Sequence, residues 1–93
     1  PLEIEAVLLK HPKVMNAAVV GVPDPVMGEN AVAFIIPRDP SNLTEEELVE
    51  YLKPLLADYK VPRKYVFVNE FPMTPSGKIQ KVKLAASLTA AQN

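Results

Sequence analysis

Two uninterrupted apolar runs constrain the fold of this 93-residue chain more than any other feature of its sequence. They cover residues 17–22 and 31–36, and each begins after an asparagine and ends before a proline. Runs of this length without a polar residue are typical of strands that are covered on both faces. Pro23 and Pro25 predict a turn between them, because proline fixes φ and lacks an N–H donor. We therefore expect an antiparallel pair joined by an eight-residue loop.

Two further segments have the spacing of amphipathic helices. Residues 1–10 place apolar side chains at i, i+3 and i+4, so we expect a helix that ends before Pro12. Residues 44–47 form a capping box ahead of leucines at i, i+4, i+7 and i+8. Pro54 lies inside this second helix and predicts a kink or a break near residues 50–54, because it removes one backbone hydrogen bond.

The rest of the chain completes an α+β pattern. Alternating side chains in residues 64–69 predict a third strand, and residues 79–91 have the composition of a helix. The apolar face that we expect for this last helix consists of Val82, Ala85, Ala86 and Leu88. The predicted fold is a small sheet of about three strands packed by helices, in the order α-β-β-α-β-loop-α.

The composition excludes several classes of site. Hydrophobic residues make up 48% of the chain and charged residues 23%, which is typical of a globular domain. The absence of cysteine excludes disulfides, a thiol nucleophile and cysteine-based zinc sites. We expect the one histidine, His11, near water at the end of the first helix, and we expect no bound metal. Since no apolar run approaches the ~20 residues that span a bilayer, we expect no transmembrane segment. The localisation that we predict is cytoplasmic.

Charge is distributed unevenly along the chain, although its net value is −1. Residues 60–93 carry six lysines and arginines against Glu70 alone, whereas residues 1–59 are acidic. The basic part could face an anion such as a phosphate or a nucleic acid, or it could be an ordinary solvated face. Few aromatic residues accompany these cations, which argues against a single-strand nucleic-acid platform, and we expect no nucleic-acid partner.

A loop of unusual composition, residues 71–78, follows the third predicted strand. Gly77 allows a positive φ and leaves space just before Lys78, and the hydroxyls of Ser76 and Thr74 are close in sequence. A lysine ammonium beside hydroxyls and backbone N–H groups suits an anionic oxygen of a phosphate or carboxylate. The loop is not a P-loop, because the pattern G-x-x-x-x-G-K-[ST] is absent. The alternative to an anion-binding loop is an ordinary turn before a helix, with the Lys78 side chain in water.

Four segments, in order, resemble motifs of the adenylate-forming acyl-CoA synthetases. Residues 72–81 resemble the closing signature P-x-T-x-S-G-K-I-x-(R/K) of this superfamily, which also holds aryl-CoA ligases, peptide-synthetase adenylation domains and firefly-type luciferases. Residues 1–14 are similar to its P-x-E-(I/V)-E-x-x-L helix and the H-P-x-V that follows. Residues 17–29 resemble A-A-V-V-G-x-P-D-x-x-x-G-E, and residues 59–63 resemble Y-K-x-P-(K/R). The resemblance covers essentially the whole chain.

The resemblance implies that residues 1–93 are a single, mobile C-terminal domain of an AMP-forming acyl-CoA or aryl-CoA ligase. Its implied partner is the large N-terminal domain, which carries the phosphate loop and the acyl pocket and is missing here. The fragment alone is expected to be inactive. A small carboxylic acid, ATP and CoA are the implied substrates, and Mg²⁺ is implied to bind through ATP and the N-terminal domain.

The resemblance also implies roles for individual residues. Lys78 corresponds to the family's adenylation lysine, and Gly77, Ser76 and Thr74 are implied to lie beside it at the nucleotide. After a rotation of the domain, the residues implied to lie near CoA are Tyr59, Lys60, Arg63 and Met27. Lys78 is also implied as a target of a lysine acetyltransferase and deacetylase, whereas Lys81 and Lys83 are expected to be solvated.

Two other functions fit the sequence. The chain could be an adenylation-domain fragment of a peptide or siderophore synthetase, which would hand the acyl group to a carrier-protein pantetheine. It could also be a stand-alone α+β module that binds nucleotides or has a regulatory role, using its basic part.

Overall fold

The computed structural model describes residues 2–24 and 28–92. Its strands are β1 (Val14–Asp24), β2 (Gly28–Pro37) and β3 (Lys64–Phe67), and its α-helices are α1 (Leu2–Leu9), α2 (Glu45–Leu52) and α3 (Lys81–Gln92). Two short 3-10 turns, η1 (Pro40–Asn42) and η2 (Asp58–Lys60), precede and follow α2 in the chain. The predicted α+β class and the predicted order of elements are confirmed.

The three strands form one mixed sheet in the order β1-β2-β3. β1 pairs antiparallel with β2, as predicted, and β3 lies parallel to β2 along its other side. Pairing within the hairpin continues to Asp24 and Gly28, so the expected eight-residue loop was wrong. Pro23 is accommodated because β1 is an edge strand, where a nitrogen that faces away from the partner strand needs no hydrogen.

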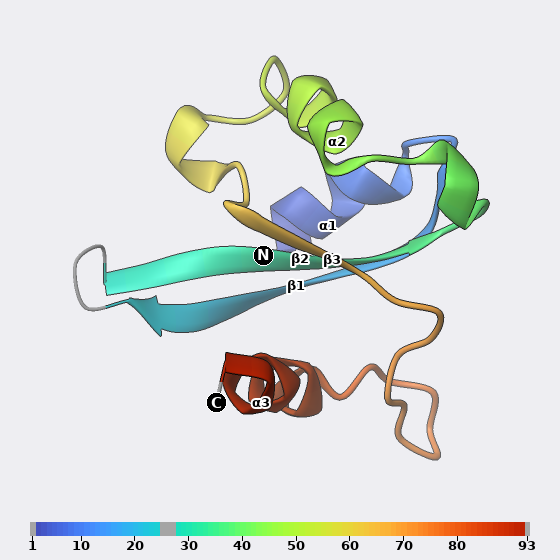
Figure 1. Ribbon diagram of the computed structural model, residues 1–93, viewed down its shortest axis with the longest axis vertical. Helices are drawn as coiled ribbons and strands as arrows, with labels where there is room; N and C mark the ends of the chain where they lie inside the picture. Colours follow the sequence, from blue (N-terminus) through green and yellow to red (C-terminus); the bar gives the residue numbers. More distant parts are fainter. Residues whose placement is uncertain (1, 25–27, 93) are drawn as a thin grey trace.

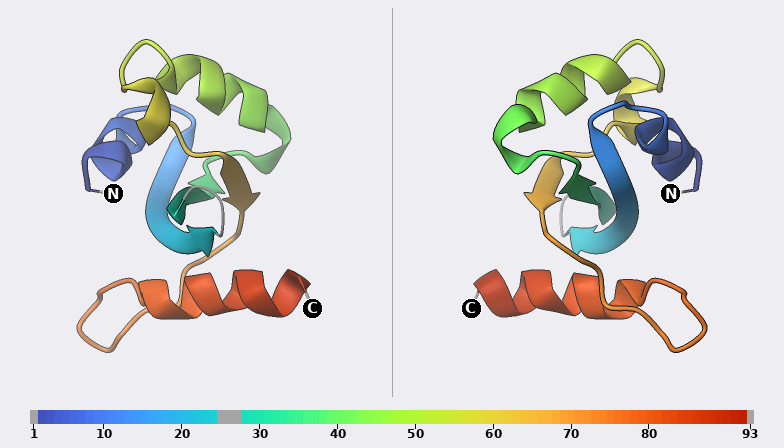
Figure 2. Two further views of the ribbon diagram at one scale, coloured as in Figure 1. Left: turned by 90° about the vertical axis from the view of Figure 1, so that its left-hand side faces the viewer. Right: turned by 90° about the vertical axis from the view of Figure 1, so that its right-hand side faces the viewer.

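Helices cover both faces of the sheet, as the two apolar runs predicted. α1 and α2 lie on one face and α3 lies on the other (Figures 1 and 2). Alternate strand residues enter the two resulting cores. Val19 and Ile35 pack in the core beneath α1 and α2, whereas Val20 and Phe34 pack in the core beneath α3. The sheet is therefore the buried middle layer of the domain, and the side of β1 away from β2 is an outer edge.

α2 begins as predicted and then stops where the sequence predicts a break. The Thr44 hydroxyl accepts a hydrogen bond from the Glu47 N–H at 3.2 Å, which caps the first turn. The helix ends at Leu52, two residues before Pro54, so the predicted break is confirmed. Leu55, beyond the break, is 54% exposed and does not join the apolar face of α2.

α3 buries a different face from the predicted one. It begins at Lys81, because Ile79 pairs with Met73 in an isolated antiparallel bridge and stays outside the helix. Leu84 is 5% exposed, whereas Val82 is 83% exposed, so the placement of Val82 in the core was wrong. Of the other residues expected on that face, Ala85 packs against the core, Ala86 is exposed, and the side chain of Leu88 lies outside the described residues.

His11 is buried, which corrects the expectation that it lies near water. Its ring meets the ring of Tyr51 edge-on, with the centroids 4.6 Å apart. Its Nδ1 accepts a hydrogen bond from the Lys13 N–H at 3.0 Å, and its Nε2 lies 3.9 Å from Glu47 Oε2. These contacts fasten the end of α1 to α2, so His11 has a structural role.

Candidate functional site

The loop between β3 and α3 folds into a tight hairpin. Its base is the bridge between Met73 and Ile79, and the Thr74 N–H donates to the Lys78 carbonyl at 2.8 Å. At the tip, the Gly77 N–H donates to the Thr74 carbonyl at 2.9 Å. Gly77 has a φ of +87°, in the left-handed region that favours glycine. The positive φ predicted for Gly77 is confirmed, and it turns the chain directly before Lys78.

Both hydroxyls of this hairpin bond within the hairpin itself. Thr74 Oγ1 accepts a hydrogen bond from the Lys78 N–H at 3.0 Å and lies 2.9 Å from Ser76 Oγ. The backbone donor of Lys78 is thus already satisfied in this conformation, and the hydroxyls order the turn. Binding of a nucleotide by Thr74, Ser76 or Gly77 stays a prediction.

The side chain of Lys78 leaves this ordered turn into solvent. Lys78 is exposed, and among the described side chains it makes no ion pair with a carboxylate. The hairpin that carries it extends away from the sheet at one end of α3 (Figure 2). Because the hairpin is already ordered, its ammonium can contact an anionic group of another domain or ligand with little loss of backbone conformational entropy.

Apolar anchors hold the base of the hairpin against the sheet. Phe71 before it and Leu84 after it are 7% and 5% exposed, and both belong to the core beneath α3. The Gln80 N–H donates to the Pro72 carbonyl at 2.8 Å, which ties the two arms together. The position of the hairpin relative to the sheet is therefore fixed from both of its ends.

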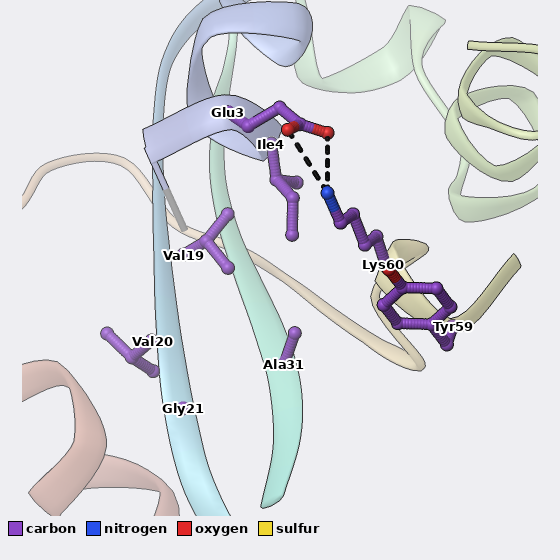
Figure 3. Close-up of a pocket in the computed structure, with 8 residues that line it drawn as sticks. All are labelled: Glu3, Ile4, Val19, Val20, Gly21, Ala31, Tyr59 and Lys60. Atoms are coloured by element: carbon purple, nitrogen blue, oxygen red, sulfur yellow. Dashed lines mark hydrogen bonds and ion pairs between the residues drawn. The ribbon is translucent and has the colours of Figure 1, made fainter. Parts of the chain in front are cut away.

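A second candidate surface lies at η2, on the side of the sheet that α1 covers. Tyr59 and Lys60 of η2 border a pocket of about 330 Å³ (Figure 3). The other residues that line it are Glu3, Ile4, Val19, Val20, Gly21 and Ala31. Tyr59 is 81% exposed, and the centroid of its ring lies 5.9 Å from Lys60 Nζ. An exposed ring beside a cation can hold a planar, negatively charged ligand.

Lys60 already has a partner in this pocket. Its Nζ lies 3.3 and 3.2 Å from the two carboxylate oxygens of Glu3 (Figure 3). Both side chains are partly exposed, so water weakens their attraction. An anion that binds Lys60 has to compete with Glu3.

The structure separates the predicted residues into two groups. Tyr59 and Lys60 lie together, whereas the hairpin of Lys78 lies at a different end of the domain (Figure 1). Arg63 is exposed and is not among the residues that line the pocket, although its N–H donates to the Ala31 carbonyl at 3.3 Å. Met27 lies outside the described residues.

Two acidic residues of α1 take part in these surfaces, although no motif in the sequence singles them out. Glu3 pairs with Lys60, and Glu5 pairs with Lys81, so the expectation of a solvated Lys81 was wrong. No short sequence pattern predicts either ion pair, because the partners come from distant parts of the chain and meet only after folding. The one hint is the excess of acids before residue 60 and of bases after it.

In the ranges 2–24 and 28–92, no group of three His, Cys, Asp or Glu side chains is arranged to hold a metal ion. Within the same ranges, no helix is long and apolar enough to cross a membrane.

Comparisons with known proteins identify the family and support the fold of this chain. The model of the AMP-binding enzyme C-terminal domain family matches residues 3–78. Human mitochondrial acyl-coenzyme A synthetase ACSM5 is 49% identical over 90 residues, which covers 90% of this chain and 15% of that protein. A Mycobacterium tuberculosis fatty acyl CoA synthetase has a TM-score of 0.91 at 40% identity, over 98% of this chain and 18% of its own. The amide bond synthetase McbA of Marinactinospora thermotolerans has a TM-score of 0.85 at 42% identity, over 91% of this chain and 17% of its own.

The chain therefore belongs to the AMP-binding enzyme C-terminal domain family, as its four motifs predicted. It spans about 15–18% of the length of these relatives.

Proposed function

We propose that this chain acts as the C-terminal domain of an ATP-dependent, AMP-forming acyl-CoA or aryl-CoA ligase, with Lys78 as its adenylation lysine. The observation that carries the proposal is the exposed Lys78, which forms no ion pair among the described side chains and stands on an ordered hairpin whose tip holds Gly77 at a positive φ. Similarity to acyl-CoA synthetases supplies the reaction. The partner of the domain is the large N-terminal domain of the same enzyme, which binds ATP and a carboxylic acid.

In the first step, a carboxylate oxygen attacks the α-phosphorus of ATP. The bond from that phosphorus to the bridging oxygen breaks, pyrophosphate leaves, and acyl-AMP forms. Mg²⁺ would bind through ATP and the N-terminal domain. Lys78 enters between the carboxylate and the α-phosphate, where its ammonium reduces their repulsion and stabilises the charge that builds up around phosphorus. Thr74, Ser76 and Gly77 hold the hairpin in shape beside the nucleotide while this happens.

In the second step, the sulfur of CoA attacks the acyl carbonyl and AMP leaves. A rotation of the domain removes the Lys78 hairpin and brings the η2 surface to CoA, with Tyr59 stacking on the base and Lys60 and Arg63 contacting phosphates. Met27 is the fourth proposed contact. The separation of the hairpin from the η2 pocket supports this division, since one orientation of the domain would not serve both steps (Figure 1).

Measurement of both half-reactions tests the proposed function. The full-length enzyme should exchange pyrophosphate with ATP in the presence of a fatty or aromatic acid, and it should form a thioester when CoA is added. The isolated 93-residue domain should do neither. Thioester formation by the isolated domain, or no acid-dependent exchange by the full-length enzyme over a broad panel of acids, would rule the function out.

The similarity to an amide bond synthetase favours a second candidate acceptor. In that case the acyl group passes from AMP to an amine, or to a carrier-protein pantetheine as in peptide and siderophore synthetases. Both candidates share the adenylation step and therefore the role of Lys78. Supplying preformed acyl-AMP with CoA, an amine or a pantetheinylated carrier protein distinguishes them, because only the true acceptor is consumed at a catalysed rate.

We also propose that acetylation of Lys78 switches the enzyme off. The side chain is exposed, and acetylation would remove its charge. Enzyme made with acetyl-lysine at position 78 should lose acid-dependent exchange and regain it after treatment with a lysine deacetylase. Full exchange activity of the acetylated enzyme would contradict this switch.

A further inference from the structure

One carboxylate joins three elements of the domain. Glu5 Oε2, from α1, accepts a hydrogen bond from the Val19 N–H of β1 at 2.7 Å. The same oxygen forms an ion pair with Lys81 Nζ at the start of α3. The side chain of Glu5 is 13% exposed and that of Lys81 is 38% exposed, so the pair is largely shielded on the carboxylate side. α1 and α3 lie on opposite faces of the sheet, so this pair passes around the edge of β1 (Figure 2).

The Glu5 carboxylate is also held in place by a contact that does not involve Lys81. β1 is an edge strand, and its Val19 N–H points away from β2, where an unpaired donor would otherwise face open solvent. Glu5 satisfies that donor, just as the Asn16 side chain accepts from the Ala17 N–H at 2.9 Å. Lys81 therefore binds an acceptor that is already ordered, so forming the ion pair does not add the cost of fixing the Glu5 side chain.

Lys81 is also the residue through which the catalytic hairpin continues into α3. It lies three positions after Lys78, and Phe71 and Leu84 already anchor both ends of the hairpin in the core beneath α3. The ion pair adds a restraint along the edge of the sheet, toward α1. It also neutralises the nearest cation of α3, which leaves Lys78 as the positive charge that the hairpin presents.

We propose that Lys81 is a positioning residue for adenylation: by binding Glu5 it fixes the start of α3 and so the direction in which Lys78 is presented. This inference rests on the proposed function of Lys78. The pair is partly exposed, so its effect on overall stability is small. Its effect on rate is larger, because a displacement of about 1 Å at a reacting group can cost up to roughly 100-fold.

Four variants of the full-length enzyme separate this role from simpler ones. Lys81→Met removes the charge but keeps the length of the side chain, and Lys81→Arg keeps the charge. Glu5→Gln removes the ion pair but leaves an amide oxygen to accept from the Val19 N–H. Lys83→Met is the matched control, since Lys83 is an exposed lysine of the same helix that forms none of the ion pairs among the described side chains.

Two readouts are needed, the rates of both half-reactions and the amide hydrogen exchange of residues 71–85. Lys81→Met and Glu5→Gln should lower kcat for adenylation by roughly 10-fold, with little change in the KM for ATP and a near wild-type rate of thioester formation from acyl-AMP. In both variants, the amide hydrogens of the hairpin and of the start of α3 should exchange with solvent faster than in wild type. Lys81→Arg and Lys83→Met should resemble wild type in both readouts.

The readouts also separate failure of this inference from failure of the proposed function. Two results would overturn the positioning role of Lys81. One is a Lys81→Met variant with unchanged rates of adenylation and of amide hydrogen exchange, and the other is an equal loss of both half-reactions. A wild-type enzyme that forms no acyl-adenylate would overturn the proposed function, and with it any role of Lys81 in that step, even if hydrogen exchange showed that the ion pair orders the hairpin.

Discussion

The ammonium of Lys60 lies 3.3 and 3.2 Å from the two carboxylate oxygens of Glu3, and this pair fastens η2 to the first turn of α1. The same ammonium lies 5.9 Å from the centroid of the Tyr59 ring, at the border of the η2 pocket. Glu3 therefore holds Lys60 beside the aromatic ring, and it also competes with any phosphate that approaches. The charge of Lys60 is available to a ligand only at the expense of this pair.

This competition predicts opposite effects for the two partners. Glu3→Gln should lower the KM for CoA by about two- to threefold, because an exposed ion pair contributes about 0–1 kcal/mol. Lys60→Ala combined with Tyr59→Ala should raise that KM and leave pyrophosphate exchange largely intact. Lys53→Ala, which breaks an exposed pair with Glu50 outside the pocket, serves as the control. A higher KM for CoA in Glu3→Gln would mean that orienting Lys60 matters more than releasing it.

Lys78→Ala should separate the two half-reactions. Loss of one preorganised charge-stabilising donor costs roughly 10²–10³-fold in rate, so adenylation should fall by that amount or more. Given synthetic acyl-AMP and CoA, the same variant should form thioester at a near wild-type rate, because the proposed rotation takes the hairpin out of the active site before this step. The check is pyrophosphate exchange beside single-turnover thioester formation. Equal losses in both steps, with an unchanged fold, would contradict the division of labour between the hairpin and η2.

The parts of the fold that the sequence predicted are those that depend on neighbours in the chain. The apolar runs gave β1 and β2, the cap at Thr44 gave the start of α2, and Pro54 explains its end. The errors arose where distant contacts decide the outcome. Val82 has the right period for a buried residue, but the bridge from Ile79 to Met73 delays the start of α3 and turns Leu84 inward instead.

The same distinction applies to the candidate site. Gly77 and Lys78 are recognisable from a short motif, since the turn needs a positive φ immediately before the lysine. The partners of Lys60 and Lys81 are not recognisable in this way. Glu3 and Glu5 sit in the first turns of a helix, where acids are favourable in any protein, and only the packing of α1 beside η2 and β1 gives them their roles.

Gly77→Ala tests whether the shape of the hairpin is needed for adenylation. A Cβ at this position would meet no atom within 4 Å, so the substitution causes no clash, but φ is +87°. A left-handed conformation costs an alanine about 1–2 kcal/mol, which should shift the hairpin and lower adenylation while thioester formation is spared. Gly77→Asn should recover most of the activity, because asparagine tolerates this region. Full adenylation activity of Gly77→Ala would show that Lys78 does not depend on this turn.

Tyr65→Phe should make the domain more stable, and more so at high pH. Tyr65 is 9% exposed, and its hydroxyl has no hydrogen-bond partner among the described residues. Burial, assisted by the charge of Glu45, raises the pKa of Tyr65 from 10.0 to about 12. Because the folded-state pKa lies above the unfolded one, the contribution of neutral Tyr65 to stability is fully present below pH 10 and is lost as the pH rises toward 12.

Phenylalanine at position 65 cannot ionise and buries no unpaired hydroxyl. Urea unfolding should therefore give the variant a free energy of unfolding up to about 1 kcal/mol above wild type at pH 7. Near pH 12 that advantage should widen by roughly 1–2 kcal/mol. Tyr59→Phe is the matched control, since Tyr59 is 81% exposed. This variant should have nearly the same free energy of unfolding as wild type, both at pH 7 and near pH 12. An advantage that stays constant from pH 7 to 12 would mean that Tyr65 ionises as readily in the folded domain as in the unfolded chain.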